Sequence, residues 1–284
     1  MKTALVFGAS GQIGAPLLER LGDAGWRVLA VSREARSDAP GRHWLQGDFA
    51  RMPALPAAVD AVFSCGPLDL FARWYEAAGL HCPRVVAFGS TSASTKQDAR
   101  DEAERELARR LLGAEARLHA AAEARGAAAT LLRPTLVYGA GRDATLTRIA
   151  AMARRWGRFV LPTRAEGLRQ PVHVDDLAAA ALAACEAQAA HGRAYDLPGG
   201  ERLPYREMVA RVLACVEPRP ALHALPMPVF LALLRLAQAR GIAGGLAPGA
   251  VARMREDLVF DAAPAARDFA YAPREFRPTP GMFG

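Results

Sequence analysis

A glycine-rich turn between a short apolar run and a helical pattern is the feature that most constrains this chain. The segment GASGQIG (8–14) follows an apolar run at 3–7 and opens an amphipathic pattern at 12–24. In such a turn the first glycine permits a tight bend, the second admits a pyrophosphate, and the third lets helix and strand pack closely. The helix N-terminus also offers N–H groups to an anion. The turn predicts a dinucleotide site at Gly8, Gly11 and Gly14, with a turn that binds no ligand as the alternative.

The first half of the chain alternates short apolar runs with helical patterns. The runs predict strands at about 3–7, 27–31, 43–46, 60–64, 84–88 and 129–133, with helices at about 12–24, 68–79 and 101–125. A recurring strand–helix–strand unit is typical of a parallel sheet covered by helices, with right-handed crossovers.

The pattern changes after Tyr138. We expect helices at 142–157 and 173–188, a late strand at 194–198, and a helical, proline-punctuated segment from 199 to 284. The predicted fold class is therefore α/β, a Rossmann-type doubly wound parallel sheet with a smaller, mostly helical C-terminal lobe. We expect a nucleotide-binding domain over 1–198, with 142–170 contributing to its cleft, and a substrate or partner lobe over 199–284.

Composition and charge exclude several other classes of protein. The 284 residues are 51% hydrophobic and 23% charged, which excludes a disordered chain, and the four cysteines are too far apart for a disulfide framework. The start MKTALVFGASG has no room for a secretory apolar region, so we expect a cytoplasmic protein. The apolar run from Ala224 to Leu234 is too short to span a bilayer. The net charge of +7 comes from scattered arginines, which favours anionic small ligands over nucleic acid.

The end of the second predicted strand bears on the choice of cofactor. An acidic residue there would bind a ribose 2′-hydroxyl, but this chain has Ser32 and Arg33. A hydroxyl and a guanidinium can bond a 2′-phosphate, which favours NADP(H). NAD(H) stays open, because Glu34 and Arg36 are close enough in sequence to leave open which residue stands at the ribose. Arg33 as a solvated strand-end charge is the alternative. Asp48 could accept from an adenine amino group or belong to a turn.

Five motifs in order carry a resemblance to a known family. They are GASGQIG (8–14), GDF (47–49), FGSTS (88–92), LLRPTLVYGAG (131–141) and PVHVDDLAAA (171–180). With these, the chain resembles the short-chain dehydrogenase/reductase superfamily, in particular its extended branch, the NAD-dependent epimerases and dehydratases. The resemblance implies nucleotide contacts at matched positions. These are Gly8, Ser10, Gly11, Gln12, Ile13 and Gly14 at the pyrophosphate, Ser32 and Arg33 at the ribose, Asp48 and Phe49 at the adenine, Ser64, Cys65 and Gly66 under the cofactor, Ser90 at the serine-bearing strand end, and Pro134, Thr135 and Val137 beside the nicotinamide.

The chain departs from this family at its catalytic pair, a tyrosine followed four residues later by a lysine. Counted back from Glu115, which matches the family's helix glutamate, the two positions fall on Leu107 and Leu111. No tyrosine lies between Tyr75 and Tyr138. Leu107 and Leu111 instead join Ala114 and Leu118 in an apolar stripe at helical spacing, which is typical of core.

A few polar side chains remain as candidates for the chemistry. Ser92 could polarise a carbonyl oxygen, and Lys96 is one of only two lysines, although a solvated loop lysine is the alternative. Further candidates for proton transfer are Ser90, Thr91, His119 and Tyr138. We interpret His119 as a half-buried helix histidine and Tyr138 as a packing residue. The acids after His173 are explained by a helix start, and the histidines show no ligand spacing, so we expect no metal.

Three functions are compatible with these features. The first is an NADP(H)-dependent reductase of a quinone, a flavin or an activated double bond, because such acceptors depend less on the missing tyrosine. The second is a non-catalytic NADP(H)-binding redox sensor or accessory subunit, and the third a nucleotide-sugar epimerase. We expect a small-molecule substrate of unknown identity, no nucleic acid and no membrane span, and we leave a homodimer open. The apolar stretch Met227–Leu236 could cover a pocket or form an oligomer contact, but we expect it to be core, which is the default for such a run.

Overall fold

The computed structural model describes residues 1–99, 101–240 and 248–283. The chain forms two compact units, which we describe separately. Unit 1 comprises Met1–Thr135, Val172–Pro198 and Asp261–Pro273, and unit 2 comprises Leu136–Pro171, Gly199–Phe260 and Arg274–Gly284.

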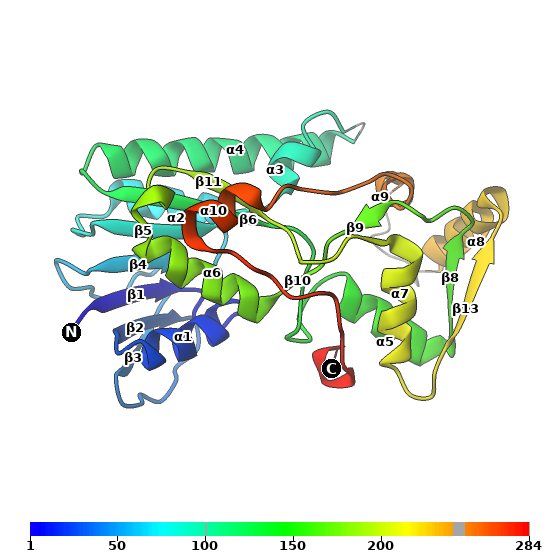
Figure 1. Cartoon of the computed structure of the whole chain (residues 1–284), viewed down its shortest axis with the longest axis horizontal. Coiled ribbons are helices and arrows are strands. Elements are labelled where there is room, and N and C mark those ends of the chain that lie inside the picture. Colours follow the sequence, from blue (N-terminus) through cyan, green and yellow to red (C-terminus); the bar gives the residue numbers. More distant parts are fainter. Residues whose placement is uncertain (100, 241–247, 284) are drawn as a thin grey trace. The chain divides into compact units, whose positions relative to one another are not determined.

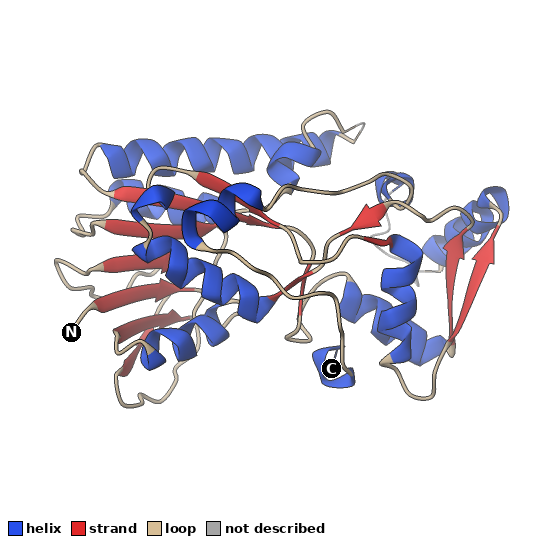
Figure 2. Ribbon diagram, viewed as in Figure 1, coloured by secondary structure: helices blue, strands red, loops and turns tan. Residues whose placement is uncertain are grey.

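Unit 1 is built on a seven-stranded sheet in the order β11-β6-β5-β4-β1-β2-β3, with every neighbouring pair parallel (labelled in Figure 1, strands red in Figure 2). The strands are β1 (Thr3–Phe7), β2 (Arg27–Ser32), β3 (Arg42–Gln46), β4 (Ala61–Ser64), β5 (Arg84–Phe88), β6 (Ala128–Pro134) and β11 (Ala194–Leu197). The order reverses between β1 and β4, so the expected doubly wound parallel sheet is confirmed.

Helices cover the two faces of this sheet (Figure 1). On one face, α2 (Leu68–Ala77) and α4 (Glu102–Glu123) pack against each other and against the inward residues Leu5, Phe7 and Leu131. On the other face, α1 (Gly14–Asp23) packs against α6 (Val174–Glu186). Alternate residues of β1 serve the two faces, because successive side chains of a strand point in opposite directions. The unit also contains α3 (Ser92–Thr95), β10 (Val172–His173), η1 (Gln188–Ala190) and α10 (Ala263–Phe269).

Unit 2 mixes helices with short strands. Its elements are β7 (Val137–Tyr138), α5 (Leu146–Trp156), β8 (Arg158–Pro162), β9 (Leu168–Arg169), β12 (Leu203–Pro204), α7 (Tyr205–Ala214), β13 (Ala221–Leu225), α8 (Met227–Ala239), α9 (Pro248–Arg253) and η2 (Pro280–Phe283). The sequence predicted its helical character but none of the strands β8, β9, β12 and β13, which pair as β8 with β13 and β9 with β12. Short strands without apolar alternation give no period-2 signal.

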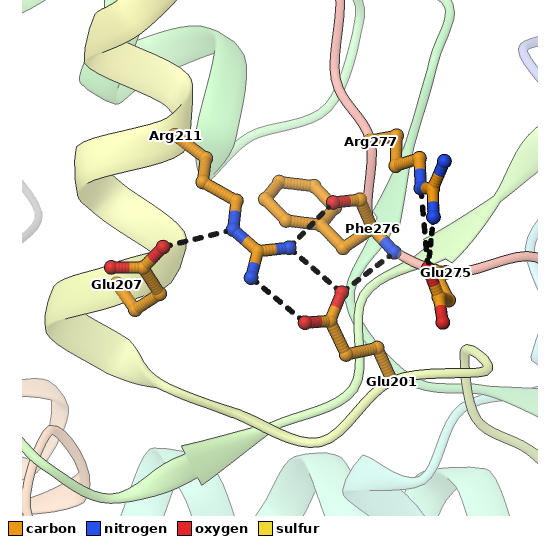
Figure 3. Close-up of polar contacts among 6 residues, drawn as sticks. All are labelled: Glu201, Glu207, Arg211, Glu275, Phe276 and Arg277. Atoms are coloured by element: carbon orange, nitrogen blue, oxygen red, sulfur yellow. Dashed lines mark hydrogen bonds and ion pairs between the residues drawn. The ribbon is translucent and has the colours of Figure 1, made fainter.

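The C-terminal segment of unit 2 is fixed to α7 by a charged clamp, shown in Figure 3. Arg211 donates to both carboxylate oxygens of Glu201, at 2.7 and 2.8 Å, and to the carbonyl oxygen of Phe276 at 2.9 Å. The backbone N–H of Phe276 donates back to Glu201 at 3.2 Å. The Phe276 ring is fully buried and meets Tyr138 edge-on at 4.8 Å between centroids. The clamp therefore secures the backbone on either side of a core side chain.

Among the described residues, no helix combines the length and apolar character needed to cross a bilayer.

Candidate functional site

The glycine turn joins β1 to α1 at the carboxyl edge of the sheet, and its geometry excludes side chains. Gly8 has a φ of +66°, and a Cβ there would lie 2.8 Å from the carbonyl carbon of Cys65. A Cβ on Gly11 would lie 2.9 Å, and one on Gly14 2.2 Å, from the carbonyl oxygen of Gly8. The turn is closed by the Gly11 N–H donating to the Gly8 oxygen at 2.9 Å. Each predicted glycine is thus required by a close approach of backbone.

The same turn has features that fit an anionic ligand. No side chain within the described residues caps α1, whose N-cap position is Ile13, and its first turn carries no acidic residue. Such a helix start leaves N–H groups and a positive dipole end for an anion. Two buried polar atoms nearby, Gln12 Oε1 and Ser64 Oγ, have no hydrogen-bond partner among the described residues. Buried polar atoms are normally satisfied, so the orphaned pair fits a polar group bound at the turn.

The end of β2 presents the residues predicted at the adenosine ribose. Ser32 is buried, and its Oγ accepts the N–H of Glu34 at 3.2 Å. Arg33 is exposed, whereas Arg36 lies over the Trp44 ring at 5.3 Å and pairs with Glu34 at 3.4 Å. Of the two arginines, Arg33 is therefore the better placed to reach a solvent-facing phosphate.

Asp48 and Phe49 follow β3 and have local structural roles. Asp48 Oδ1 accepts the N–H groups of Arg51 at 2.8 Å and Ala50 at 2.9 Å. These bonds, with a smaller contribution from the charge of Arg33, lower the pKa of Asp48. The structure therefore supports the interpretation of Asp48 as a turn residue. Its contact with an adenine stays a prediction. Phe49 stacks on Phe7 at 5.2 Å between centroids.

The segment after β4 lies against the glycine turn. The N–H of Cys65 donates to the carbonyl oxygen of Phe7 at 2.9 Å, which extends the pairing of β4 with β1. A Cβ on Gly66 would lie 3.6 Å from the Phe49 ring, so Gly66 and Phe49 are neighbours. Burial raises the pKa of the Cys65 thiol to about 12, which makes the thiolate scarce at neutral pH. Cys65 is thus suited to packing rather than to nucleophilic chemistry.

The serine-bearing segment after β5 is tied to the end of β6. Thr91 is buried, and its N–H and Oγ1 both donate to the carbonyl oxygen of Pro134 at 3.3 Å. Ser90 Oγ accepts the N–H of Ser92, at the start of α3, at 3.1 Å. The structure therefore brings Ser90 and Ser92 close to Pro134, while the N–H of Thr135 donates to Leu197 of β11 at 3.3 Å. Val137, predicted beside them, is half-buried in β7 and belongs to unit 2.

Lys96 follows α3 and forms an ion pair with Glu104 of α4, with 3.5 Å between Nζ and Oε1. The ammonium is partly buried rather than solvated. Its catalytic role stays a prediction, and its charge is already partly compensated by Glu104.

The apolar stripe of α4 is core only in its second half. Ala114 and Leu118 belong to the core of unit 1, whereas Leu107 and Leu111 are half-buried and lie outside that core. The expectation of a fully buried stripe was therefore wrong for these two leucines. The two leucines leave apolar surface at the positions that the count from Glu115 predicts for the family's catalytic pair.

All five tyrosines of the chain are buried, none being more than 9% exposed. Tyr195 donates to Asp268 at 2.7 Å and Tyr271 to the carbonyl oxygen of Pro198 at 2.8 Å. Burial raises the pKa of Tyr195 to about 12, and it also raises the pKa of Tyr75, Tyr205 and Tyr271. Because their pKa values are raised and their side chains are buried, none of these four phenols is suited to exchange a proton with a substrate near neutral pH. Tyr138 packs on Phe276, as its sequence context indicated.

A buried charged cluster lies between α4, β6 and β11, and sequence reasoning missed it. Arg133 donates from Nε to Glu115 Oε1 at 2.8 Å and from Nη2 to Oε2, and Asp196 Oδ1 lies 3.9 Å from Arg133 Nη1. His119, one turn beyond Glu115, is half-buried, and burial lowers its pKa. The available signal was an arginine within the apolar strand sequence LLRP (131–134).

The acids after His173 lie in the first turn of α6, as predicted, but the cap itself is His173. Its Nδ1 accepts the N–H of Asp175 at 3.2 Å. Within the described part of the chain, no group of three or more His, Cys, Asp or Glu side chains is arranged to hold a metal ion.

Comparisons with known proteins agree with this geometry. The sequence profile of the NAD dependent epimerase/dehydratase family matches residues 4–76 and 75–197. A 2-alkyl-3-oxoalkanoate reductase of Stenotrophomonas maltophilia (strain K279a) is 28% identical over 249 residues, which is 75% of either chain.

Two solved structures have the same fold. One is the terminal R domain from the myxalamid PKS-NRPS biosynthetic pathway, with a TM-score of 0.74 at 18% identity over 99% of this chain and 88% of that one. The other is the epimerase Mth375 from Methanothermobacter thermautotrophicus, with a TM-score of 0.70 at 16% identity over 97% of this chain and 89% of that one. Since the family profile covers more than half of the sequence, the chain belongs to the NAD-dependent epimerase/dehydratase family.

Proposed function

We propose that the protein is an NADP(H)-dependent reductase whose acceptor is a quinone, a flavin or an activated double bond. The observation that carries the proposal is the absence of an accessible phenol. Counted from Glu115, Leu107 and Leu111 fall at the positions of the family's tyrosine and lysine, and all five tyrosines of the chain are buried. Reduction of a simple ketone or alcohol exchange needs a proton donor at the oxygen. A quinone, a flavin or an activated double bond spreads the negative charge it gains over several atoms, and water can supply the proton.

The residues of unit 1 fit an NADP(H) molecule. The turn at Gly8, Gly11 and Gly14 would hold the pyrophosphate, and the exposed guanidinium of Arg33 would pair with the 2′-phosphate. When bound, the cofactor would supply the hydride. Ser90 and Ser92, held close to Pro134 by the bonds of Thr91, would line the place of the acceptor without taking part in the proton transfer.

A second candidate is the reduction of a 3-oxo acid or ester, favoured by the match to a 2-alkyl-3-oxoalkanoate reductase. Such a substrate has a carbonyl oxygen that must be polarised, and Ser92 is the group in unit 1 we assign to it. The half-buried Leu107 and Leu111 suit an alkylated substrate better than a polar sugar. A nucleotide-sugar epimerase depends most on the missing pair and fits least.

Measurements of cofactor binding and of NADPH turnover test these two candidate functions. Purified protein should bind NADPH with a micromolar or lower dissociation constant, and Arg33→Ala should weaken NADPH at least tenfold more than NADH. Arg27→Ala, at the other end of β2, is the matched control and should change neither. Equal losses for the two cofactors in Arg33→Ala would contradict the 2′-phosphate contact.

Turnover is measured as NADPH oxidation with a quinone, a flavin, an α,β-unsaturated ketone and a 3-oxo ester. The proposal expects turnover with at least one of the first three acceptors and little effect of Ser92→Ala on it. Turnover with the oxo ester that falls at least tenfold in Ser92→Ala, but not in Ser94→Ala, would favour the second candidate. Tight NADPH binding without turnover on any acceptor would reject both and favour a redox sensor.

A further inference from the structure

Helix α8 (Met227–Ala239) of unit 2 carries apolar residues on two faces, of which only one is packed. Phe230 is buried and the helix packs on β8. Val229, Leu233 and Leu236 recur at i, i+4 and i+7 on another face and are 47%, 48% and 48% exposed. Residues at this spacing share one side of a helix. The expectation that Met227–Leu236 would be core is therefore wrong for this outer face.

Two sequence segments, which contain α8 and the paired strands β8 and β13, carry exposed arginines and no acidic residue. The segments 144–165 and 218–240 contain eight arginines and neither Asp nor Glu. They are joined because β8 pairs with β13 along five residues and α8 packs on β8. All eight arginines are exposed: Arg148, Arg154, Arg155, Arg158, Arg164, Arg219, Arg235 and Arg240. Asp143, Glu166 and Glu217 are the nearest acids along the chain and lie just outside these segments.

The positive charge of the chain is concentrated in unit 2. This unit holds 17 arginines and eight acidic residues, a net charge of +9, whereas unit 1 holds 19 basic and 21 acidic residues, a net charge of −2. The scattered appearance of the arginines along the sequence thus conceals a strong division in the fold. Unit 2 is a cationic body that also exposes an apolar helix face.

We propose that the outer face of α8, with its flanking arginines, binds the surface of an anionic lipid bilayer. Val229, Leu233 and Leu236 would enter the boundary between headgroups and acyl chains, and the arginines would meet lipid phosphates. Thirteen residues extend about 20 Å, too short for a hydrocarbon core of about 30 Å, so α8 would lie in the interface. The inference does not depend on the reductase activity.

The charge distribution favours a bilayer over other occupants. A symmetric contact through α8 would bring the arginines of these two segments from both copies together, which is repulsive. A nucleic acid would engage the arginines but would leave the three apolar side chains in water. An anionic bilayer satisfies both kinds of group at once.

The test is flotation of the full-length protein with vesicles of phosphatidylcholine alone, or with 30% phosphatidylglycerol, at 50 mM and 500 mM NaCl. The protein should float with the anionic vesicles at low salt, and binding should fall at high salt and without the anionic lipid. Val229→Ser/Leu233→Ser/Leu236→Ser should lower the partition coefficient at least tenfold with the charge unchanged. Arg235→Gln/Arg240→Gln should lower it about 30-fold and reduce its salt dependence.

Matched controls come from unit 1. Leu70→Ser removes another exposed leucine, and Arg27→Gln/Arg73→Gln removes two exposed arginines, and neither should alter flotation. Circular dichroism and NADPH binding verify that every variant is folded.

Three results would overturn the proposal. They are no flotation of the wild type at low salt, flotation that the triple serine variant retains, and a wild-type dimer that the triple serine variant converts to a monomer in light scattering.

Discussion

Glu115 on α4 accepts hydrogen bonds from both Nε and Nη2 of Arg133 on β6, and Glu115 is only 5% exposed. Bonding to Glu115 raises the pKa of Arg133. A Cβ on Gly89, which follows β5, would lie 3.2 Å from the Glu115 carboxylate. The ion pair thus connects the long helix to the sheet directly behind the segment that carries Ser90 and Ser92.

Removal of one partner from this pair should strongly destabilise unit 1. Glu115→Ala leaves the Arg133 charge half-buried without its bidentate acceptor, so we expect a loss of about 3 kcal/mol in the free energy of unfolding. Urea unfolding followed by circular dichroism measures it. Glu123→Ala, at the exposed end of the same helix, is the control and should show no measurable loss. A similar small change in both variants would mean that the pair contributes little.

The glycines of α1 provide a contrast between a required and a replaceable residue. Gly14→Ala would place a Cβ 2.2 Å from the Gly8 oxygen and must distort the turn, so NADPH binding should weaken at least tenfold. Gly22→Ala, in the same helix, has no atom within 4 Å of its new Cβ and should stabilise the protein by about 0.5 kcal/mol. Fluorescence titration and urea unfolding test the pair. Unchanged NADPH affinity in Gly14→Ala would remove the glycine turn from the binding site.

Much of unit 1 could be predicted from the sequence, because its strands are continuous apolar runs between amphipathic helices. The predicted run at 84–88 coincides with β5, and the one at 129–133 falls within β6. The glycine turn was predictable because the positive φ of Gly8 and the contacts of Gly11 and Gly14 with the Gly8 oxygen lie within the turn itself. Unit 2 was less predictable. β8 pairs with β13 across about 60 residues of sequence, and neither segment carries an apolar alternation that would reveal the pairing.

The residues proposed for the chemistry were harder to predict from the sequence than those proposed to contact the nucleotide. A missing tyrosine is visible in the sequence, but the burial of all five tyrosines depends on long-range packing, as for Tyr138 on Phe276. The pairing of Lys96 with Glu104 likewise depends on how α3 meets α4. In the sequence, Arg133 is a single charge within an apolar run, and its partner Glu115 lies 18 residues earlier on a helix. Charge partners across elements leave no periodic signal.

The clamp at Arg211 should matter more than its partial exposure indicates. Arg211→Met removes two bonds to Glu201 and one to the Phe276 oxygen, so we expect a loss of about 2 kcal/mol in the free energy of unfolding. Arg277→Met removes a pair with Glu275 whose arginine side chain is 83% exposed, and it should have no measurable effect. Thermal and urea unfolding of the two variants give the comparison. Equal stability of both would show that the buried Phe276 ring suffices to hold the segment.

The pH dependence of stability should carry a contribution from His119. Burial is the largest cause of its lowered pKa, with the charge of Arg133 acting in the same direction and that of Glu115 opposing it. Since the pKa of His119 is lower in the folded than in the unfolded state, the unfolded chain binds more protons as the pH falls below about 6.5. Stability should therefore be full above pH 7.5 and decline between pH 7 and 5.

Most carboxylates stay ionised over that range, so histidines dominate the slope. His119→Leu should reduce the slope of unfolding free energy against pH, and His191, whose pKa burial also lowers, should account for part of the remainder. Urea unfolding at half-unit intervals from pH 5 to 8 measures both slopes, with His81→Leu as an exposed control. A slope in His119→Leu equal to that of the wild type would show that the burial of this imidazole has no energetic consequence for folding.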